Sequence, residues 1–137
     1  MPLNVEVTAG QVHESTRFES VFDDIGIPQP LGRPRKRPRR ATGDKGYSCM
    51  RIRTWLADHG ITAIIPHKDN ELARTDGRTK FDKLAYKRRC IIEQVIGWLK
   101  ECRRIATRFE KLAINFSAML KLAIIQHCLK ITFSDRA

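Results

Sequence analysis

The chain has 137 residues, 26 of them Lys or Arg and 15 of them Asp or Glu, and its formal net charge at pH 7 is +11. This length allows one domain with a single hydrophobic core. The charge favours a polyanion as the partner, with nucleic acid ahead of an anionic membrane surface. No run of the sequence approaches the ~20 apolar residues of a membrane span, and the N-terminus lacks the basic and apolar regions of a signal peptide, so we expect a cytoplasmic protein.

Cysteine and histidine usage gives no sign of a disulfide framework or a structural zinc site. The sequence has no C-x-x-C pair, which suits a reducing compartment. The histidines are scattered along the chain, so they do not have the spacing of zinc ligands. The four cysteines are Cys49, Cys90, Cys102 and Cys128.

The first two predicted elements are a strand and a helix. From Pro2 to Gly10, apolar and polar residues alternate, the pattern of a strand buried on one face. From His13 to Ile25, apolar residues recur at helical spacing, and Gly26 follows as an end signal. We therefore expect a strand of the central sheet and a short amphipathic helix that covers it.

A basic, proline-rich segment follows from Ile27 to Arg40, named here the basic arm. It holds four of the six prolines, which excludes helix and central strand. One interpretation is a solvated linker, and the other is an arm that contacts phosphates. We favour contact with nucleic acid without sequence preference, because phosphates carry no sequence information. Six cations lie in the second half of the arm: Arg33, Arg35, Lys36, Arg37, Arg39 and Arg40.

A strand, a helix and a second strand come next, the alternation of an α/β sheet. Residues Ala41 to Asp44 are expected to form the tip of a short strand. A helix is predicted from Ser48 to His59, with Gly60 as its C-terminal stop. The short apolar run from Ile61 to Ile65 reads as a buried strand. Taken by itself, an Asp before Lys-Gly is most often a turn or helix-cap residue.

One long helix is predicted from Asp82 to Ile105, after a polar surface loop from His67 to Lys80. On a wheel of about 3.6 residues per turn, four polar residues fall within an arc of roughly 60°, opposite the apolar side. These residues are Tyr86, Arg89, Glu93 and Lys100. Such a face can be an ordinary solvated surface with one ion pair, or an open functional surface.

A second basic cluster lies after this helix and includes Arg103 and Arg104, which we also expect to contact nucleic acid. A more apolar helix is then predicted from Ile114 to Ile131. Its broad apolar face requires burial on the domain or against another chain.

The spacing of the four polar residues is more informative than their shared face. It reads Tyr, two residues, Arg, three residues, Glu, six residues, Lys. In this spacing the chain resembles bacterial insertion-sequence transposases with an Asp-Asp-Glu active site, of the insertion-sequence-four/five type. GDKGY at Gly43 to Tyr47 looks like the second-aspartate motif of that family. RRIATRFEKLAINF from Arg103 resembles the segment after the glutamate helix, and PLNVEVTAGQVHEST from Pro2 resembles the segment after the first aspartate.

The resemblance implies a fold and a chemistry. The implied fold is α/β, a truncated RNase H-like catalytic domain at residues 1–112 with a C-terminal helical extension at residues 113–137. Asp44 and Glu93 would be catalytic residues and ligands of Mg²⁺ or Mn²⁺, in two-metal cleavage and strand transfer of DNA. Tyr86, Arg89 and Lys100 would hold the DNA backbone beside them.

The resemblance also implies partners and a location. The partner would be double-stranded DNA at the insertion-sequence ends, together with an upstream transposase portion or a second copy of the chain. We expect a bacterial, cytoplasmic and nucleoid-associated protein that does not engage a membrane.

Three departures from the family pattern bear on this prediction. The first aspartate lies a few residues upstream of the position of Pro2 in relatives, and the N-terminal DNA-binding region of full relatives is also missing. Ser48 stands where relatives often have an acidic residue. Three hypotheses remain: a transposase fragment or second-frame product that is inactive alone, a noncatalytic DNA-binding protein that regulates intact transposase, and a fragment that does not fold. We favour the first.

Overall fold

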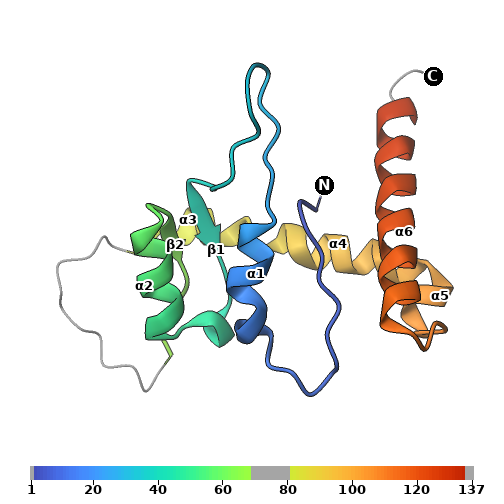
Figure 1. The fold of residues 1–137 in the computed structure, drawn as a ribbon, viewed down its shortest axis with the longest axis horizontal. Coiled ribbons are helices and arrows are strands. Elements are labelled where there is room, and N and C mark those ends of the chain that lie inside the picture. Colours follow the sequence, from blue (N-terminus) through green and yellow to red (C-terminus); the bar gives the residue numbers. More distant parts are fainter. Residues whose placement is uncertain (1, 69–80, 135–137) are drawn as a thin grey trace. The chain divides into compact units, whose positions relative to one another are not determined.

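The computed structural model describes residues 2–68 and 81–134. Contacts divide the chain into two compact units: the sheet unit, His13–Cys90, and the helical unit, Met1–Val12 with Ile91–Ala137. Figure 1 shows the elements of both. The predicted single domain stays a prediction, and most of the loop predicted at His67 to Lys80 lies outside the described residues.

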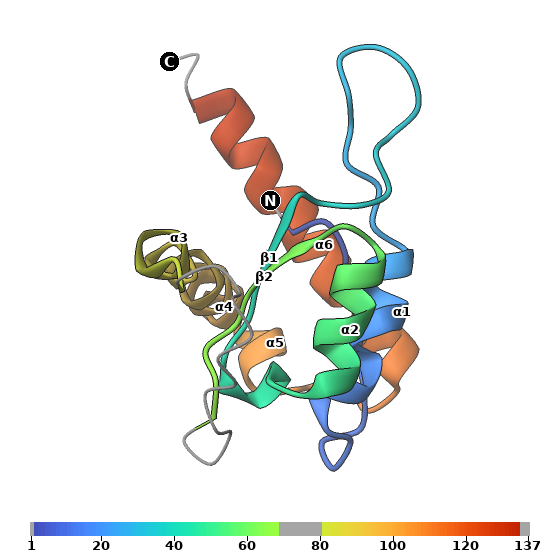
Figure 2. The ribbon, with the colours of Figure 1, turned by 90° about the vertical axis from the view of Figure 1, so that its left-hand side faces the viewer.

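The sheet unit mixes helices with a small parallel sheet, consistent with the α/β class. The strands β1 and β2 pair in parallel, with Ala41 opposite Ala63, and α2 connects them along the chain (Figure 2). The helix before Gly60 and the strand after it are confirmed with shorter bounds, as is the first helix. The strand predicted to end at Asp44 is also observed, but it begins at Arg40 and ends at Thr42, so Asp44 lies outside it. The elements are η1 (Glu14–Arg17), α1 (Phe18–Asp23), β1 (Arg40–Thr42), η2 (Lys45–Tyr47), α2 (Met50–Asp58), β2 (Thr62–Ile64) and α3 (Lys83–Lys87).

Gly60 ends α2 as the sequence predicted. Its φ of +65° lies in the left-handed region, which glycine adopts without a Cβ clash. The N–H of Gly60 donates to the carbonyl of Ala57 at 3.0 Å, and the N–H of Ile61 donates to the carbonyl of Leu56 at 2.8 Å. This pair of bonds is the Schellman arrangement, and it turns the chain directly into β2.

The core of the sheet unit forms where α1 and α2 meet the two strands. Ile52 and Leu56 lie one turn apart on α2 and are fully buried. Phe18 of α1 stacks on Phe22 with ring centroids 4.5 Å apart, and both rings meet Trp55 of α2 edge-on at 5.8 and 5.7 Å. Aromatic edge contacts of this kind add to the area that the helices bury.

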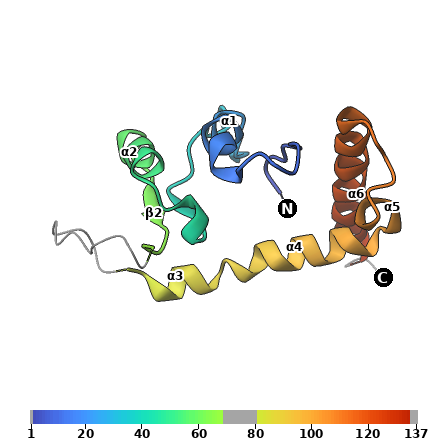
Figure 3. The same cartoon turned by 90° about the horizontal axis from the view of Figure 1, so that it is seen from below.

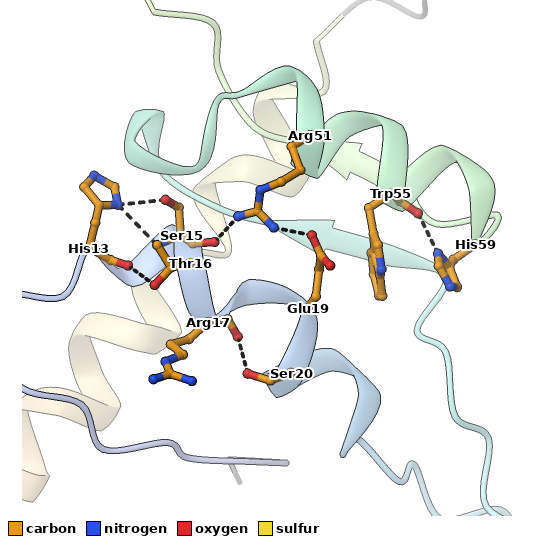
Figure 4. A network of polar contacts seen from close by, with 9 residues as sticks. All are labelled: His13, Ser15, Thr16, Arg17, Glu19, Ser20, Arg51, Trp55 and His59. Atoms are coloured by element: carbon orange, nitrogen blue, oxygen red, sulfur yellow. Dashed lines mark hydrogen bonds and ion pairs between the residues drawn. The ribbon is translucent and has the colours of Figure 1, made fainter.

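Polar contacts fasten the N-terminal helical segment to α2 (Figure 4). The guanidinium of Arg51 forms an ion pair with Glu19 and donates to the carbonyl of Ser15 at 2.6 Å. Nδ1 of His13 accepts the N–H of Ser15 at 3.3 Å and so caps η1. The segment before the basic arm is therefore held by charge as well as by aromatic packing.

The helical unit comprises α4 (Cys90–Glu101), α5 (Arg103–Ala106) and α6 (Ala113–Ser134), of which α4 starts at the last residue of the sheet unit. Trp98 of α4 stacks on His127 of α6 with ring centroids 3.8 Å apart. The predicted helix from Ile114 to Ile131 is confirmed and is slightly longer than expected.

The single helix predicted from Asp82 to Ile105 is wrong, because the chain forms α3, α4 and α5 in its place (Figure 3). The N–H of Arg88 donates to Ala85 at 3.2 Å, and the N–H of Arg89 donates to Tyr86 at 2.9 Å. These bonds span three residues instead of four, which tightens the backbone into a turn after α3. Three consecutive cations at this turn also repel one another, and repulsion disfavours a regular helix.

The strand predicted from Pro2 to Gly10 is also not observed, since the described part of this segment forms no strand. An alternating pattern indicates a strand only where a neighbouring strand accepts its N–H and C=O groups. Leu3, which the pattern placed on the buried face, is 49% exposed.

Residues Ala113–Phe133 of α6 are long and apolar enough to cross a membrane, by length and composition alone. The sequence analysis expected no run long and apolar enough to span a membrane, and this helix contradicts that expectation. One helix of this kind is weak evidence of a span, because the core helix of a soluble protein passes the same test.

The buried face of α2 gives a test of the fold. Ile52→Ala removes three methyl or methylene groups from a fully buried site and should lower the free energy of unfolding by about 2 to 5 kcal/mol. Met50→Ala, at a position 57% exposed on the same helix, should change it by less than about 0.5 kcal/mol. Urea unfolding followed by tryptophan fluorescence measures both, and equal effects would contradict the assigned core.

Candidate functional site

Asp44 lies just beyond the carboxyl end of β1, where it caps the next turn. The N–H of Gly43 donates to the carbonyl of Ile64 at 3.4 Å and so carries the strand pairing one residue past β1. Asp44 follows as the N-cap of η2, and its Oδ1 accepts the N–H of Gly46 at 2.8 Å. The cap orients the carboxylate and uses one of its two oxygens, at an edge where α/β sheets commonly place functional groups.

Hydrogen bonds of Ser48 and Arg53 fix the turn that carries Asp44. Ser48 is buried, and its Oγ accepts a hydrogen bond from Nη2 of Arg53 at 2.9 Å. The same nitrogen donates to the carbonyl of Ile65 at 3.1 Å, just past β2. One guanidinium therefore links the segment after β1 to the segment after β2. Ser48 thus contributes a buried hydroxyl to this turn.

Tyr47 contacts the same turn, and the pKa of its phenol is raised. Its pKa is raised from 10.0 to about 12, first by burial and then by the nearby carboxylates of Glu14 and Asp44. Its O–H donates to Oε2 of Glu14 at 3.3 Å. The phenol therefore stays neutral near Asp44 and acts as a hydrogen-bond donor.

Tyr86 and Arg89 lie together at the end of α3. The guanidinium carbon of Arg89 is 5.8 Å from the centroid of the Tyr86 ring, within cation–π range. Asp82 starts α3 by accepting the N–H of Ala85 at 2.9 Å, and its second oxygen is 3.8 Å from Arg40 of β1. The start of α3 is thus tied to the strand that leads to Asp44.

Glu93 and Lys100 are both exposed on α4. Lys100 follows Glu93 at the seventh position, which places the two on the same side of the helix about two turns apart. Glu93 lies in the first turn and Lys100 in the last, where each charge interacts favourably with the helix dipole.

The cations of the basic arm divide into two groups. Arg37 is turned inward: Nη1 lies 2.9 Å from Oδ1 of Asp23, and the guanidinium carbon is 5.1 Å from the Trp55 ring. Contact of Arg37 with DNA stays a prediction, but its role within the protein is to anchor the arm. The exposed cations are Arg33, Arg35, Lys36, Arg39 and Arg40.

Arg103 and Arg104 line an open hollow with Thr107 and Phe109. Nη2 of Arg104 lies 2.6 Å from Oε1 of Glu110, and its guanidinium is 4.9 Å from the Phe109 ring. The hollow therefore has one held guanidinium and one exposed cation on its wall.

Within the described part of the chain, the structure does not gather a complete set of metal ligands. Among residues 2–68 and 81–134, no three of His, Cys, Asp and Glu come together as a cation site. Asp44 belongs to the sheet unit and Glu93 to the helical unit. Each supplies carboxylate oxygen, the donor that Mg²⁺ and Mn²⁺ prefer, so their chemistry fits a divalent cation while their number falls short.

Comparison with known proteins identifies the class to which these features belong. The family described as "Transposase DDE domain" matches residues 1–126, and the chain belongs to that family. It is 32% identical over 128 residues to a Burkholderia cepacia protein named "Putative transposase for insertion sequence element IS402". That match covers 93% of this chain and 56% of the relative, so the chain spans about half the relative's length. No solved structure matches.

Sequence reasoning missed Glu14 and, as a neighbour of Asp44, Tyr47. Tyr47 follows Asp44 by three residues within the quoted motif, so its position in the turn was a usable signal. Glu14 precedes Tyr47 by 33 residues, and no periodicity reports a contact between residues that far apart.

The Tyr47 phenol can be tested by titration. The chain has two tyrosines, so Tyr86→Phe leaves one phenol, whose ionisation should be seen by ultraviolet absorbance only as the pH approaches about 12. Because the folded pKa is raised, the phenol's contribution to stability is complete below pH 10.0 and is lost as the pH rises through about 12. Glu14→Gln should move the pKa back toward 10.0, since it removes a negative charge and weakens an acceptor.

Asp58→Asn is the matched control for this titration, because it removes an exposed carboxylate elsewhere in the sheet unit. An unchanged titration in Glu14→Gln would show that the contact between Glu14 and Tyr47 does not exist in solution.

Proposed function

We propose that this chain forms part of the catalytic core of an insertion-sequence transposase and contributes two of its three acidic residues. The observation that carries the proposal is the position of Asp44, capped and partly buried just beyond a strand of a parallel pair. Family membership and the Tyr86, Arg89, Glu93 and Lys100 spacing support the second acid, Glu93. The substrate is double-stranded DNA at the ends of the element.

In this proposal Asp44 and Glu93 would hold Mg²⁺ or Mn²⁺, and a divalent cation there would supply Lewis-acid activation for phosphodiester cleavage. Two carboxylates fall short of the three acids of an Asp-Asp-Glu site, so in this proposal an upstream portion of the transposase would supply the third. The chain alone is therefore inactive in DNA cleavage and strand transfer.

The remaining polar residues would hold the DNA backbone. Arg89, already placed over the Tyr86 ring, can offer a phosphate two parallel N–H donors. Lys100 offers a point charge on α4, the helix of Glu93. The exposed cations of the basic arm and the pair Arg103 and Arg104 extend the interface along the duplex.

The fold that suits this function is an RNase H-like sheet, in which β1, α2 and β2 would be one strand–helix–strand unit. In open α/β sheets, ligands bind beyond the carboxyl ends of the strands, which is where Asp44 lies. A cytoplasmic location beside the nucleoid goes with a DNA substrate.

A second candidate is a noncatalytic DNA-binding protein that regulates intact transposase. The exposed cations of the basic arm favour it, because phosphate contacts of this kind require no metal.

Removing the two acids separates the candidates. Asp44→Asn keeps an oxygen that can accept the Gly46 N–H, so the cap survives while the charge is removed. Asp44→Asn and Glu93→Gln should each reduce Mg²⁺-dependent nicking of element-end DNA by at least about a hundredfold. The assay uses a form extended upstream through the missing aspartate, with the 137-residue chain measured beside it.

Matched controls remove nearby charges outside the proposed site: Asp58→Asn in α2 and Glu101→Gln in α4, both exposed. They should leave nicking unchanged. If the extended form is inert while the short chain binds DNA without metal, the regulatory candidate replaces the catalytic one.

The basic arm predicts a particular salt dependence. Changing Arg33, Arg35 and Lys36 together to Ala should weaken DNA binding and lower the slope of log K against log salt by about 0.9 for each phosphate that the variant no longer neutralises. Fluorescence anisotropy of a labelled duplex over a salt series measures the slope.

The control for this change in charge alters three exposed lysines of the helical unit instead: Lys111, Lys121 and Lys130. An equal fall in slope for both triple variants would mean that net charge alone, and not the arm, sets the affinity.

A further inference from the structure

The basic arm is closed at its neck, the hydrogen-bonded pair Ile27 and Arg35, and is fixed to the neighbouring helices by Arg37. The N–H of Ile27 donates to the carbonyl of Arg35 at 2.9 Å, and the N–H of Arg35 donates back to Ile27 at 2.8 Å. Just past the neck, Arg37 is held by Asp23 and lies over the Trp55 ring. The arm is therefore not a loose linker but a loop attached to α1 and α2, and it extends away from them (Figures 1 and 2).

Beyond the neck, the loop presents an apolar residue at its exposed end. Every residue from Pro28 to Lys36 is exposed. Leu31 is 91% exposed, the largest value among the exposed large hydrophobic residues of the described chain. Gly32 follows with a φ of +87° and open space around the position of a Cβ, so the chain bends there with nothing packed against it.

Leu31 makes no contribution to the core, and two features beside it identify a partner. Arg33, Arg35 and Lys36 follow within five residues, a density of charge that complements a polyanion. Pro30 precedes Leu31, and Pro34 lies at the neck, so two residues of the loop have a fixed φ, which lowers the conformational entropy that the loop loses on binding. A basic loop around an apolar tip fits nucleic acid better than a protein surface, which would require a larger apolar patch.

We infer that Leu31 is a wedge that inserts between two stacked base pairs from the minor groove of DNA, while the cations beside it hold the flanking phosphates. Apolar side chains at the ends of basic loops unstack base steps and kink the duplex in this way. The inference rests on the proposed function, because it requires that the chain bind double-stranded DNA. It adds a separate action, local distortion of the duplex, and a residue that performs it.

The wedge also predicts which DNA it prefers. Pyrimidine–purine steps such as TA and CA are flexible and unstack easily, whereas A-tracts are stiff. The same loop would therefore select deformable steps without any hydrogen bond to a base.

The test uses the full chain and duplexes with 2-aminopurine beside a central TA step, since the fluorescence of this base rises when it unstacks. The wild-type chain should raise the fluorescence severalfold on the TA duplex and much less on an A-tract. Leu31→Ser should abolish the rise but change the dissociation constant by less than about tenfold, because the phosphate contacts remain. Leu31→Met, which keeps an apolar side chain of similar length, should restore the rise.

Leu112→Ser is the matched control, because it removes another exposed leucine outside a helix, 64% exposed in the helical unit. It should leave the fluorescence rise intact. Circular dichroism should show that Leu31→Ser folds as the wild type does, as expected for a side chain that contacts solvent.

Different results overturn the inference and the proposed function. A wild-type chain that binds the duplexes but raises no fluorescence, or a Leu31→Ser variant that raises it fully, overturns the wedge and leaves DNA binding intact. A wild-type chain that binds no duplex at low salt overturns the proposed function, and the wedge with it.

Discussion

The sheet unit depends on the burial of one face of α2. Ile52 and Leu56 fill the space between this helix and the parallel strands, while Trp55 on the adjoining side meets Phe18 and Phe22 of α1. The strands are only three residues long, and a pair of that size has too little hydrogen bonding to persist alone. Apolar packing therefore supplies the stability, and the backbone pairing supplies the register that places Asp44.

Trp55 also connects the core to the surface that we assign to DNA. One of its neighbours is the guanidinium of Arg37, which is held from the other side by Asp23. A protein with a net charge of +11 must keep its cations apart, and here an acid and an aromatic ring hold the half-buried cation of the basic arm. The other cations of the arm then face outward without destabilising the fold beneath them.

Local patterns predicted the first helix, α2 and β2 of the sheet unit well. Helical spacing, the Gly60 stop and a short apolar run were sufficient for α2 and β2, because each is a signal carried by adjacent residues. The strand at Pro2 to Gly10 could not be judged in this way, since alternation does not reveal whether a partner strand is present. The interruption at Arg88 and Arg89 was missed because helical periodicity continues across it, although the backbone bonds tighten there.

Some properties of the candidate site residues could be predicted from the sequence, and others could not. Asp44 and Glu93 came from a motif resemblance, and residue chemistry alone would have read Asp44 as a cap, which it also is. The inward turn of Arg37 and the contact between Glu14 and Tyr47 depend on tertiary neighbours, so composition could not distinguish them from solvated charges.

The division of the chain into units has a consequence for its biosynthesis. The sheet unit is one unbroken stretch, His13–Cys90, whereas the helical unit combines Met1–Val12 with Ile91–Ala137. A ribosome adds about 5 to 20 residues per second, so the sheet unit is complete on the order of a few seconds before the last helix has been translated. The first segment of the helical unit, Met1–Val12, would thus be without the rest of its unit until α6 has been translated.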